Sequence, residues 1–173
     1  MKGTILKCLQ EMVEKRHSKE SWQQILDEAG LEGTQFFSLS SDVPDTDAIA
    51  LFEASASVLG LSAQETADAF GSYWVNDYAA RVYQTLYGRL RSAREFILAL
   101  DGVHLMVTNT IANARPPRFD YEEESENSLL VTYKSQRGLI DLYAGLARGV
   151  GEYFSTPLEV TKLSRNQVRI RFL

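Results

Sequence analysis

The fold of this chain is decided by the stretch FILALDGVHLMVTNTI at residues 96–111 and by the ANARPP segment that follows it at 112–117. Apolar residues in the stretch recur at spacings of three and four, which predicts an amphipathic helix with one buried stripe. The stripe consists of Phe96, Leu100, Val103, Val107 and Ile111, and His104 lies on it. The helix must end before Pro116, because a proline disfavours helical backbone at the residue before it.

Downstream of the prolines the period of the apolar pattern changes from about four to two. The alternating segment 129–137 predicts a strand, in which residues two positions apart point to the same side. Tyr133, Ser135 and Arg137 are spaced in this way. We therefore expect two hydroxyl groups and one guanidinium group to form a single row.

Upstream of residue 96 the pattern predicts four further helices. They are expected at roughly residues 2–16, from Ser18 to Gly30, from Asp45 or Thr46 to Gly60, and from Ser62 through an aromatic segment with Phe70, Tyr73, Trp74 and Tyr78. Ser62 and Glu65 have capping-box spacing. Residues 31–45 are predicted to be a loop with Phe36, Phe37 and Leu39 turned inward.

The C-terminal part of the chain predicts two β-hairpins separated by a helix. The first pairs residues 119–123 with 129–133, the helix runs from Gly138 to about Phe154, and the second hairpin pairs 157–163 with 167–172. Helices come first and strands last, so the predicted class is α+β: an N-terminal helical subdomain, then a small antiparallel sheet with an inserted helix. No linker or repeat divides the sequence, and we expect a single domain over residues 1–173.

Composition excludes several classes of function. The 18 basic and 23 acidic residues give a net charge of −5 without a basic cluster, which argues against nucleic acid and anionic membrane surfaces as partners. No apolar window is long enough to span a bilayer, and Lys7, Gln10 and Glu11 interrupt any signal-peptide core. Cys8 is the single cysteine, which excludes a disulfide framework and favours a reducing cytoplasm.

The candidate chemistry rests on a combination of residues. A lone histidine such as His104 on an apolar stripe is about four times more often a hydrogen-bonded core residue than a ligand. The alternation at 133–137 is about equally compatible with an ordinary half-exposed strand. Together, however, an imidazole can supply an axial bond to haem iron, while hydroxyl groups and an arginine can bind the paired haem carboxylates.

Five segments, spread over nearly the whole chain, carry a family resemblance. They are Met1-Lys2-Gly3-Thr4-Ile5, Phe70-Gly71-Ser72-Tyr73-Trp74-Val75, Leu100-Asp101-Gly102-Val103-His104-Leu105, Ala114-Arg115-Pro116-Pro117, and Tyr133-x-Ser135-x-Arg137. On these residues the chain resembles the H-NOX family, haem nitric oxide/oxygen-binding domains that also occur in soluble guanylate cyclase. The resemblance implies the H-NOX fold, with haem b (iron protoporphyrin IX) buried between the helical subdomain and the sheet.

The resemblance also implies roles for individual residues. His104 corresponds to the proximal iron ligand, and Tyr133, Ser135 and Arg137 correspond to the residues that bind the haem propionates. Pro117 matches the proline that presses on the porphyrin and helps to distort it.

The distal residues implied by the resemblance bear on the choice of gas. Ile5, Leu9, Trp74, Tyr78 and Leu142 are assigned to the cofactor pocket. Relatives that bind oxygen stably usually place a tyrosine where this chain has Leu142, because bound dioxygen needs a hydrogen-bond donor. The apolar Leu142 favours nitric oxide, and carbon monoxide to a lesser degree. The neighbouring Tyr143 is rotated by about 100° along the helix and is expected to face away.

Two distal side chains keep alternatives open. Trp74 could donate through its indole N–H, although filling the pocket wall is favoured by about two to one. Tyr78 lies four residues after Trp74 on the same helix face and could supply the missing donor. An oxygen sensor that uses Tyr78 is therefore the alternative.

The resemblance implies a haem-based gas sensor of bacterial, cytoplasmic type rather than an enzyme. Nitric oxide is expected to bind ferrous haem opposite His104 and to weaken the iron–histidine bond, which shifts the helix and biases a partner protein. Bacterial relatives act on a histidine kinase or a diguanylate cyclase, or are fused to chemotaxis receptors. Peroxidase chemistry needs distal acid–base groups, which Leu9, Trp74 and Leu142 do not supply. A haem-free helical interaction module is the third possibility.

Overall fold

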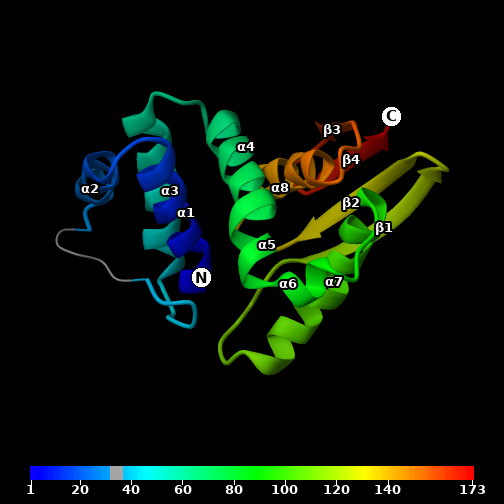
Figure 1. Cartoon of the computed structure of the whole chain (residues 1–173), viewed down its shortest axis with the longest axis horizontal. Helices are drawn as coiled ribbons and strands as arrows, with labels where there is room; N and C mark the ends of the chain where they lie inside the picture. Colours follow the sequence, from blue (N-terminus) through cyan, green and yellow to red (C-terminus); the bar gives the residue numbers. More distant parts are fainter. Residues whose placement is uncertain (32–36) are drawn as a thin grey trace. The chain divides into compact units, whose positions relative to one another are not determined.

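The computed structural model describes residues 1–31 and 37–173, which form two compact units, residues 1–66 and 67–173 (Figure 1). The first unit holds α1 (Gly3–Arg16), α2 (Lys19–Glu28) and α3 (Asp45–Leu59). These bounds agree with the sequence pattern and its capping signals. The Ser18 side chain accepts a hydrogen bond from the Ser21 amide at the start of α2, and Gly60 ends α3 in the left-handed conformation.

Between α2 and α3 the prediction of inward side chains is confirmed for one residue and wrong for another. Phe37 is buried and packs edge-on against Trp22 with ring centroids 6.3 Å apart. The prediction for Leu39 is wrong, because its side chain is 55% exposed in a polar turn. Phe36 lies outside the described residues.

The start of α1 depends on the glycine at position 3. A Cβ atom there would lie 2.1 Å from Ser41 Oγ and 2.3 Å from the Ser38 carbonyl oxygen, so no larger residue fits. The Gly3 amide donates to the Ser41 carbonyl at 2.8 Å. This close approach fixes the segment before α3 against the first turn of α1.

The aromatic helix is interrupted by a π-helical segment that the periodicity does not predict. The capping box of Ser62 and Glu65 starts α4 (Ala63–Tyr73) as expected, with Ser62 N donating to Glu65 Oε2 at 2.8 Å. The chain then continues as a π-helix, η1 (Trp74–Tyr78), followed by the short helices α5 (Ala79–Val82) and α6 (Gln84–Tyr87). The Asn76 side chain donates to the Ser72 carbonyl at 2.9 Å and thus competes for a carbonyl of the preceding turn.

Helix α7 (Ala93–Thr110) carries the predicted stripe, but not over its whole length. Ser92 caps the helix by accepting from the Glu95 amide at 3.1 Å. Phe96 is buried, whereas the later stripe residues Leu100, Val103 and Val107 are only partly buried. Ile111 lies beyond the helix end and is 41% exposed.

The strands form one antiparallel sheet in the order β1-β2-β4-β3. Strands β1 (Arg118–Ser125) and β2 (Ser128–Lys134) form the first predicted hairpin, and β3 (Leu158–Lys162) and β4 (Gln167–Phe172) form the second. Helix α8 (Ile140–Tyr153) connects β2 to β3. The predicted α+β class is therefore confirmed.

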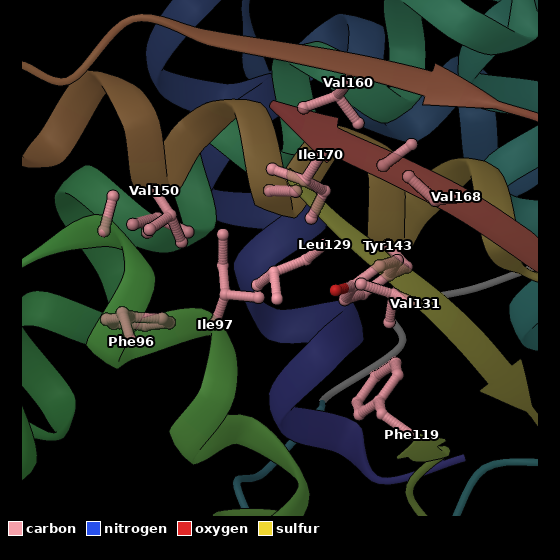
Figure 2. Close-up of a cluster of buried hydrophobic side chains, with 14 of the residues drawn as sticks. Phe96, Ile97, Phe119, Leu129, Val131, Tyr143, Val150, Val160, Val168 and Ile170 are labelled. Carbon is pink, nitrogen blue, oxygen red and sulfur yellow. The ribbon is translucent and has the colours of Figure 1, made fainter. Parts of the chain in front are cut away.

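Helices α7 and α8 pack against one face of the sheet and form the core of the second unit (Figure 2). The inward residues of the sheet alternate along the strands as predicted. They include Phe119, Leu129, Val131, Val168 and Ile170. Every helix within residues 1–31 and 37–173 is too short or too polar to cross a bilayer.

Helices α4 and α8 approach each other closely through glycines. A Cβ atom on Gly71 would lie 2.1 Å from the Gly145 carbonyl carbon, and one on Gly149 would lie 2.6 Å from the Gly71 carbonyl oxygen. Asn76 Nδ2 also donates to the Gly149 carbonyl at 3.3 Å. These contacts fix η1 against α8.

Candidate cofactor site

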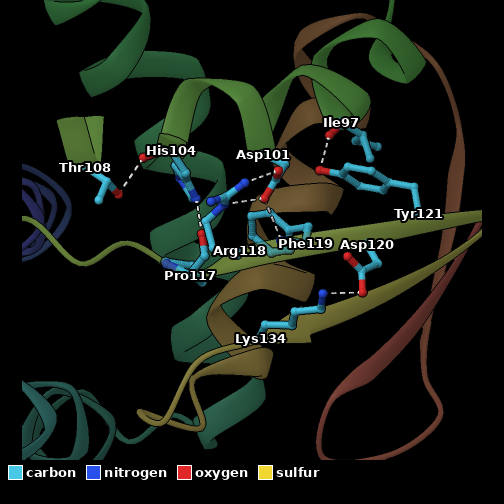
Figure 3. Close-up of polar contacts among 10 residues, drawn as sticks. All are labelled: Ile97, Asp101, His104, Thr108, Pro117, Arg118, Phe119, Asp120, Tyr121 and Lys134. Atoms are coloured by element: carbon cyan, nitrogen blue, oxygen red, sulfur yellow. Dashed lines mark hydrogen bonds and ion pairs between the residues drawn. The ribbon is translucent and has the colours of Figure 1, made fainter. Parts of the chain in front are cut away.

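His104 lies in the C-terminal half of α7 and faces the start of β1 (Figure 3). Its Nδ1 atom is 2.7 Å from the carbonyl oxygen of Pro117. A carbonyl can only accept, so Nδ1 carries the hydrogen and Nε2 keeps its lone pair. This tautomer is the one that metal-binding histidines use, with the second nitrogen held by a backbone carbonyl.

The protonation of His104 is also suited to metal binding. Burial lowers the pKa of the imidazole, and this effect outweighs the hydrogen bond to Pro117 and the charge of Asp101, both of which raise it. The ring is therefore neutral at neutral pH. Its Nε2 lone pair is available to a metal without prior loss of a proton.

An acidic group one turn before His104 binds the start of β1. The Asp101 carboxylate accepts from Arg118 Nε at 2.7 Å, from Arg118 Nη2 at 2.6 Å and from the Phe119 amide at 2.8 Å (Figure 3). The adjacent guanidinium is the main reason that the pKa of Asp101 falls to about 2. The sequence pattern does not indicate this pair, because 17 residues separate its members.

Polar contacts connect α7 to β1 along much of their lengths. Counted from the N-terminal end of α7, each contacting residue lies three or four positions after the previous one. All of these residues therefore lie on one face of the helix. In order, the contacts are Arg94 to Glu123, the Ile97 carbonyl to the Tyr121 hydroxyl, Asp101 to Arg118, and His104 to the Pro117 carbonyl. Helix α7 is thus held in register with β1.

The polar row of Tyr133, Ser135 and Arg137 is not built as a strand. Strand β2 ends at Lys134, and the next residues form a turn that leads to Gly138 in the left-handed region at φ 67°. The prediction that the three residues alternate along one strand is therefore wrong for Ser135 and Arg137. The Ser135 hydroxyl instead accepts from the Arg137 amide at 3.3 Å, a turn typical of serine.

The turn still keeps the three polar side chains in one neighbourhood. Burial raises the pKa of the Tyr133 hydroxyl, while a hydrogen bond with Ser135 and the nearby charge of Arg137 oppose this shift. Arg137 Nη1 donates to the Arg115 carbonyl, just before the two prolines. A guanidinium with two hydroxyl groups beside it is suited to a ligand that presents carboxylates.

The chemistry of these donors fits an iron porphyrin. The imidazole offers one neutral nitrogen, so a metal held there needs its other ligands from a cofactor, as in haem. The acidic tails of such a cofactor match the cationic and hydroxyl groups at 133–137. If haem were bound here, it would supply an iron that can bind a diatomic gas.

The aromatic residues of η1 lie against each other, as their spacing predicts. The rings of Trp74 and Tyr78 stack with centroids 5.4 Å apart and an interplanar angle of 29°, and Phe70 lies 5.9 Å from Trp74. Tyr78 is 1% exposed, whereas Trp74 is partly buried. In the other compact unit, Ile5 and Leu9 lie one turn apart on α1, with Leu9 buried and Ile5 partly buried.

Leu142 and Tyr143 occupy different environments on α8. Leu142 is partly buried. Tyr143 is 3% exposed and packs on the sheet, with its ring 4.7 Å from that of Phe119 and 6.4 Å from that of Tyr133 (Figure 2). Among the described residues its hydroxyl has no hydrogen-bond partner. The sequence pattern gave no signal for this hydroxyl.

With the fold and site described, comparison with known proteins defines the class of protein. The Haem-NO-binding family model matches residues 2–162. The chain belongs to this family, and it is an H-NOX domain related to soluble guanylate cyclase. H-NOX domains bind haem, and they are gas-sensing rather than catalytic domains.

Curated relatives and solved structures agree with this assignment. The chain is 26% identical over 167 residues to soluble guanylate cyclase gcy-37 of Caenorhabditis elegans, a match that covers 94% of this chain and 24% of the relative. It is 24% identical over 157 residues to gcy-32 of the same organism, covering 88% of this chain and 23% of that relative. The chain therefore spans about a quarter of the length of these relatives.

Among solved structures, the fold resembles an H-NOX protein from S. oneidensis in the Fe(II)NO ligation state. The TM-score is 0.88 at 16% identity, with 100% of this chain and 99% of that chain covered. An oxygen-binding H-NOX domain in its oxygen complex gives a TM-score of 0.83 at 22% identity, covering 99% of this chain and 95% of that one. Similar folds thus occur in structures with either gas.

Proposed function

We propose that this chain is a nitric oxide sensor that binds haem b through Nε2 of His104. Tyr133, Ser135 and Arg137 hold the haem carboxylates, and Pro117 contacts the porphyrin. The observation that carries the proposal is the 2.7 Å contact between His104 Nδ1 and the Pro117 carbonyl, because it leaves Nε2 as a neutral donor. Membership of a haem-binding family supports the choice of cofactor.

Both compact units belong to one functional domain in this proposal. The family match covers residues 2–162 and so includes all but the first residue of the first unit and most of the second. The roles predicted for Ile5 and Leu9 remain predictions. A chain whose single cysteine is Cys8 is suited to a reducing cytoplasm, where we place the protein.

The preference for nitric oxide follows from the apolar Leu142. A leucine offers no hydrogen bond to bound dioxygen, whereas nitric oxide does not depend on a distal donor, and carbon monoxide is a weaker second ligand. The alternative is an oxygen sensor in which Tyr78 is the donor. Its support is specific, since Tyr78 is buried and stacks on Trp74 in η1, a π-helical segment of the kind often found at functional sites.

We infer that signalling starts at His104 and proceeds through α7. A gas that weakens the bond between His104 and iron shifts the balance between two positions of this helix. The contacts between α7 and β1 then move the two elements together. The partner that responds is a histidine kinase, a diguanylate cyclase or a chemotaxis receptor.

An anaerobic spectrum of the ferrous protein tests this proposal, followed by the same sample with nitric oxide, with carbon monoxide and with air. We expect a Soret band that changes with nitric oxide and carbon monoxide, and no stable oxygen complex in air. Absence of a Soret band after expression with ample haem would contradict the proposal. A stable oxygen spectrum that is lost in Tyr78→Phe would replace the nitric oxide assignment with the oxygen alternative.

A further inference from the structure

The Asp101 carboxylate binds the start of strand β1. It accepts three hydrogen bonds, two from the fork of Arg118 and one from the Phe119 amide, all between 2.6 and 2.8 Å. A bidentate contact between arginine and a carboxylate fixes both distance and orientation. The backbone of residues 118–119 is thereby held at one position relative to α7.

The residue held in this way directly follows the hydrogen-bond acceptor of His104. The Pro117 carbonyl belongs to the peptide group that ends at the Arg118 nitrogen, so an anchor on residues 118 and 119 also orients this carbonyl. On the other side Pro116 and Pro117 have fixed φ angles. The carbonyl that faces His104 Nδ1 is thus constrained from both directions.

On the helix, the two residues of this arrangement are also close together along the chain. Asp101 precedes His104 by three residues, so both side chains lie on one face of α7 (Figure 3). The carboxylate, the guanidinium, the proline carbonyl and the imidazole form a closed path from helix to strand and back. A change in any member alters the geometry of the hydrogen bond at Nδ1.

From this geometry we propose that Asp101 and Arg118 are positioning residues for His104. They hold the Pro117 carbonyl against Nδ1 and so set the strength of the bond that Nε2 makes to iron. The inference rests on the proposed function of His104. It goes beyond that function by assigning the control of the ligand to two residues outside the proposed set of cofactor-binding residues.

The physical basis is the effect of the outer hydrogen bond on an imidazole ligand. A strong acceptor at Nδ1 makes Nε2 more basic and fixes the plane of the ring, and loss of such outer contacts typically weakens metal binding by 10-fold to 100-fold. Asp101→Asn keeps the size of the side chain but removes the charge that binds Arg118. The Pro117 carbonyl then loses its anchor, and the bond to iron weakens.

The test is the iron–histidine stretching frequency of the ferrous haem protein, measured by resonance Raman spectroscopy. We expect a lower frequency in Asp101→Asn, together with a roughly 10-fold faster transfer of haem to an apoprotein acceptor. Asp120→Asn is the matched control. Asp120 lies two residues after Arg118 on β1, is exposed and pairs with Lys134, so this variant makes the same chemical change without removing a hydrogen bond of the path.

Three outcomes separate the possibilities. A lower frequency in Asp101→Asn and an unchanged one in Asp120→Asn support the proposal. A lower melting temperature in Asp101→Asn with the wild-type frequency overturns it, because the pair would then only join helix and strand. A wild-type haem protein without an iron–histidine stretch would instead overturn the proposed role of His104.

Arg118→Lys gives a second measurement that also decides the case if Asp101→Asn does not fold. Lysine keeps the positive charge but cannot form the two parallel bonds of the guanidinium fork. We expect a frequency between those of the wild type and Asp101→Asn. A frequency equal to that of the wild type would count against the proposal.

Discussion

Two polar rings lie close to Phe119, and they differ in whether they have a hydrogen-bond partner. The His104 ring lies 5.4 Å from Phe119, and the Tyr143 ring lies 4.7 Å from it. Nδ1 of His104 has an acceptor at 2.7 Å, the Pro117 carbonyl, and the next two residues hydrogen-bond to Asp101. The Tyr143 hydroxyl, although almost fully buried, has no partner among the described residues.

The difference indicates which of the two groups the fold is built to hold. A buried polar atom without a partner costs roughly 1–3 kcal/mol, whereas a satisfied one contributes about 1 kcal/mol. Several hydrogen-bond donors and acceptors surround His104. Among the described residues, none bonds to the Tyr143 hydroxyl. This contrast favours a packing role for Tyr143 and supports the proposed role of His104 as a ligand.

Removal of the imidazole should have the largest effect. We expect His104→Gly to abolish haem retention, because the variant lacks the nitrogen that we propose as the iron ligand. The measurement is the ratio of Soret to protein absorbance after purification.

Added imidazole provides the control for His104→Gly. A free imidazole can occupy the space of the side chain and should restore a Soret band in the variant. If His104→Gly keeps the wild-type spectrum without imidazole, the assignment of the ligand is wrong.

Acid should have the next largest effect, because it titrates the Asp101 carboxylate near His104. The folded pKa of Asp101 is about 2, below its ordinary value, so the carboxylate stabilises the folded state above the ordinary pKa and loses this contribution as pH falls through about 2. We expect the free energy of unfolding to decrease over this window, and to decrease less in Asp101→Asn. Urea denaturation between pH 5 and 2.5 measures the difference.

Glu124 requires a control in the acid experiment. Its pKa is also lowered to about 2, chiefly by Arg169, so the wild-type curve contains both contributions. The difference between wild type and Asp101→Asn isolates Asp101. If both proteins lose the same free energy between pH 5 and 2.5, Asp101 does not titrate as described.

Much of the fold follows from local sequence signals, as α7 and the sheet illustrate. Apolar spacing predicts the buried start of the α7 stripe at Phe96, and alternation at Val168 and Ile170 predicts the inward face of β4. The π-helix at Trp74–Tyr78 was not predicted, because apolar spacing over five residues hardly distinguishes it from an α-helix. The side-chain hydrogen bond from Asn76 to the Ser72 carbonyl in this segment is also not visible from spacing.

The candidate site was predictable in its residues but not in its geometry. His104 and the row at 133–137 stand out by residue type, yet period-two reasoning extended a strand through Ser135 that the structure ends at Lys134. After Lys134 a serine turn and Gly138 in the left-handed conformation replace the strand, because local hydrogen bonds outweigh the alternating pattern. Asp101 and Arg118 were missed because their contact depends on tertiary structure.

Replacement of Tyr143 by phenylalanine is the smallest change and the sharpest test of the comparison. Tyr143→Phe removes the hydroxyl and leaves the packing against Phe119 intact. We therefore expect the free energy of unfolding to increase by about 1–3 kcal/mol. The matched control is Tyr121→Phe, whose hydroxyl donates to the Ile97 carbonyl at 2.7 Å. That variant should lose about 1 kcal/mol.

Stability changes of opposite sign in the two tyrosine variants would show that hydrogen-bond partners, rather than burial, distinguish the two hydroxyl groups on this face of the sheet. Both side chains carry the same hydroxyl, and both pack near Phe119, so ring size and aromatic contact are matched. Chemical denaturation of the two variants and the wild type under the same conditions gives the signs directly. A loss of stability in Tyr143→Phe as large as that in Tyr121→Phe would mean that the Tyr143 hydroxyl has a partner in solution, and it would then join His104 as a polar group that the fold supports.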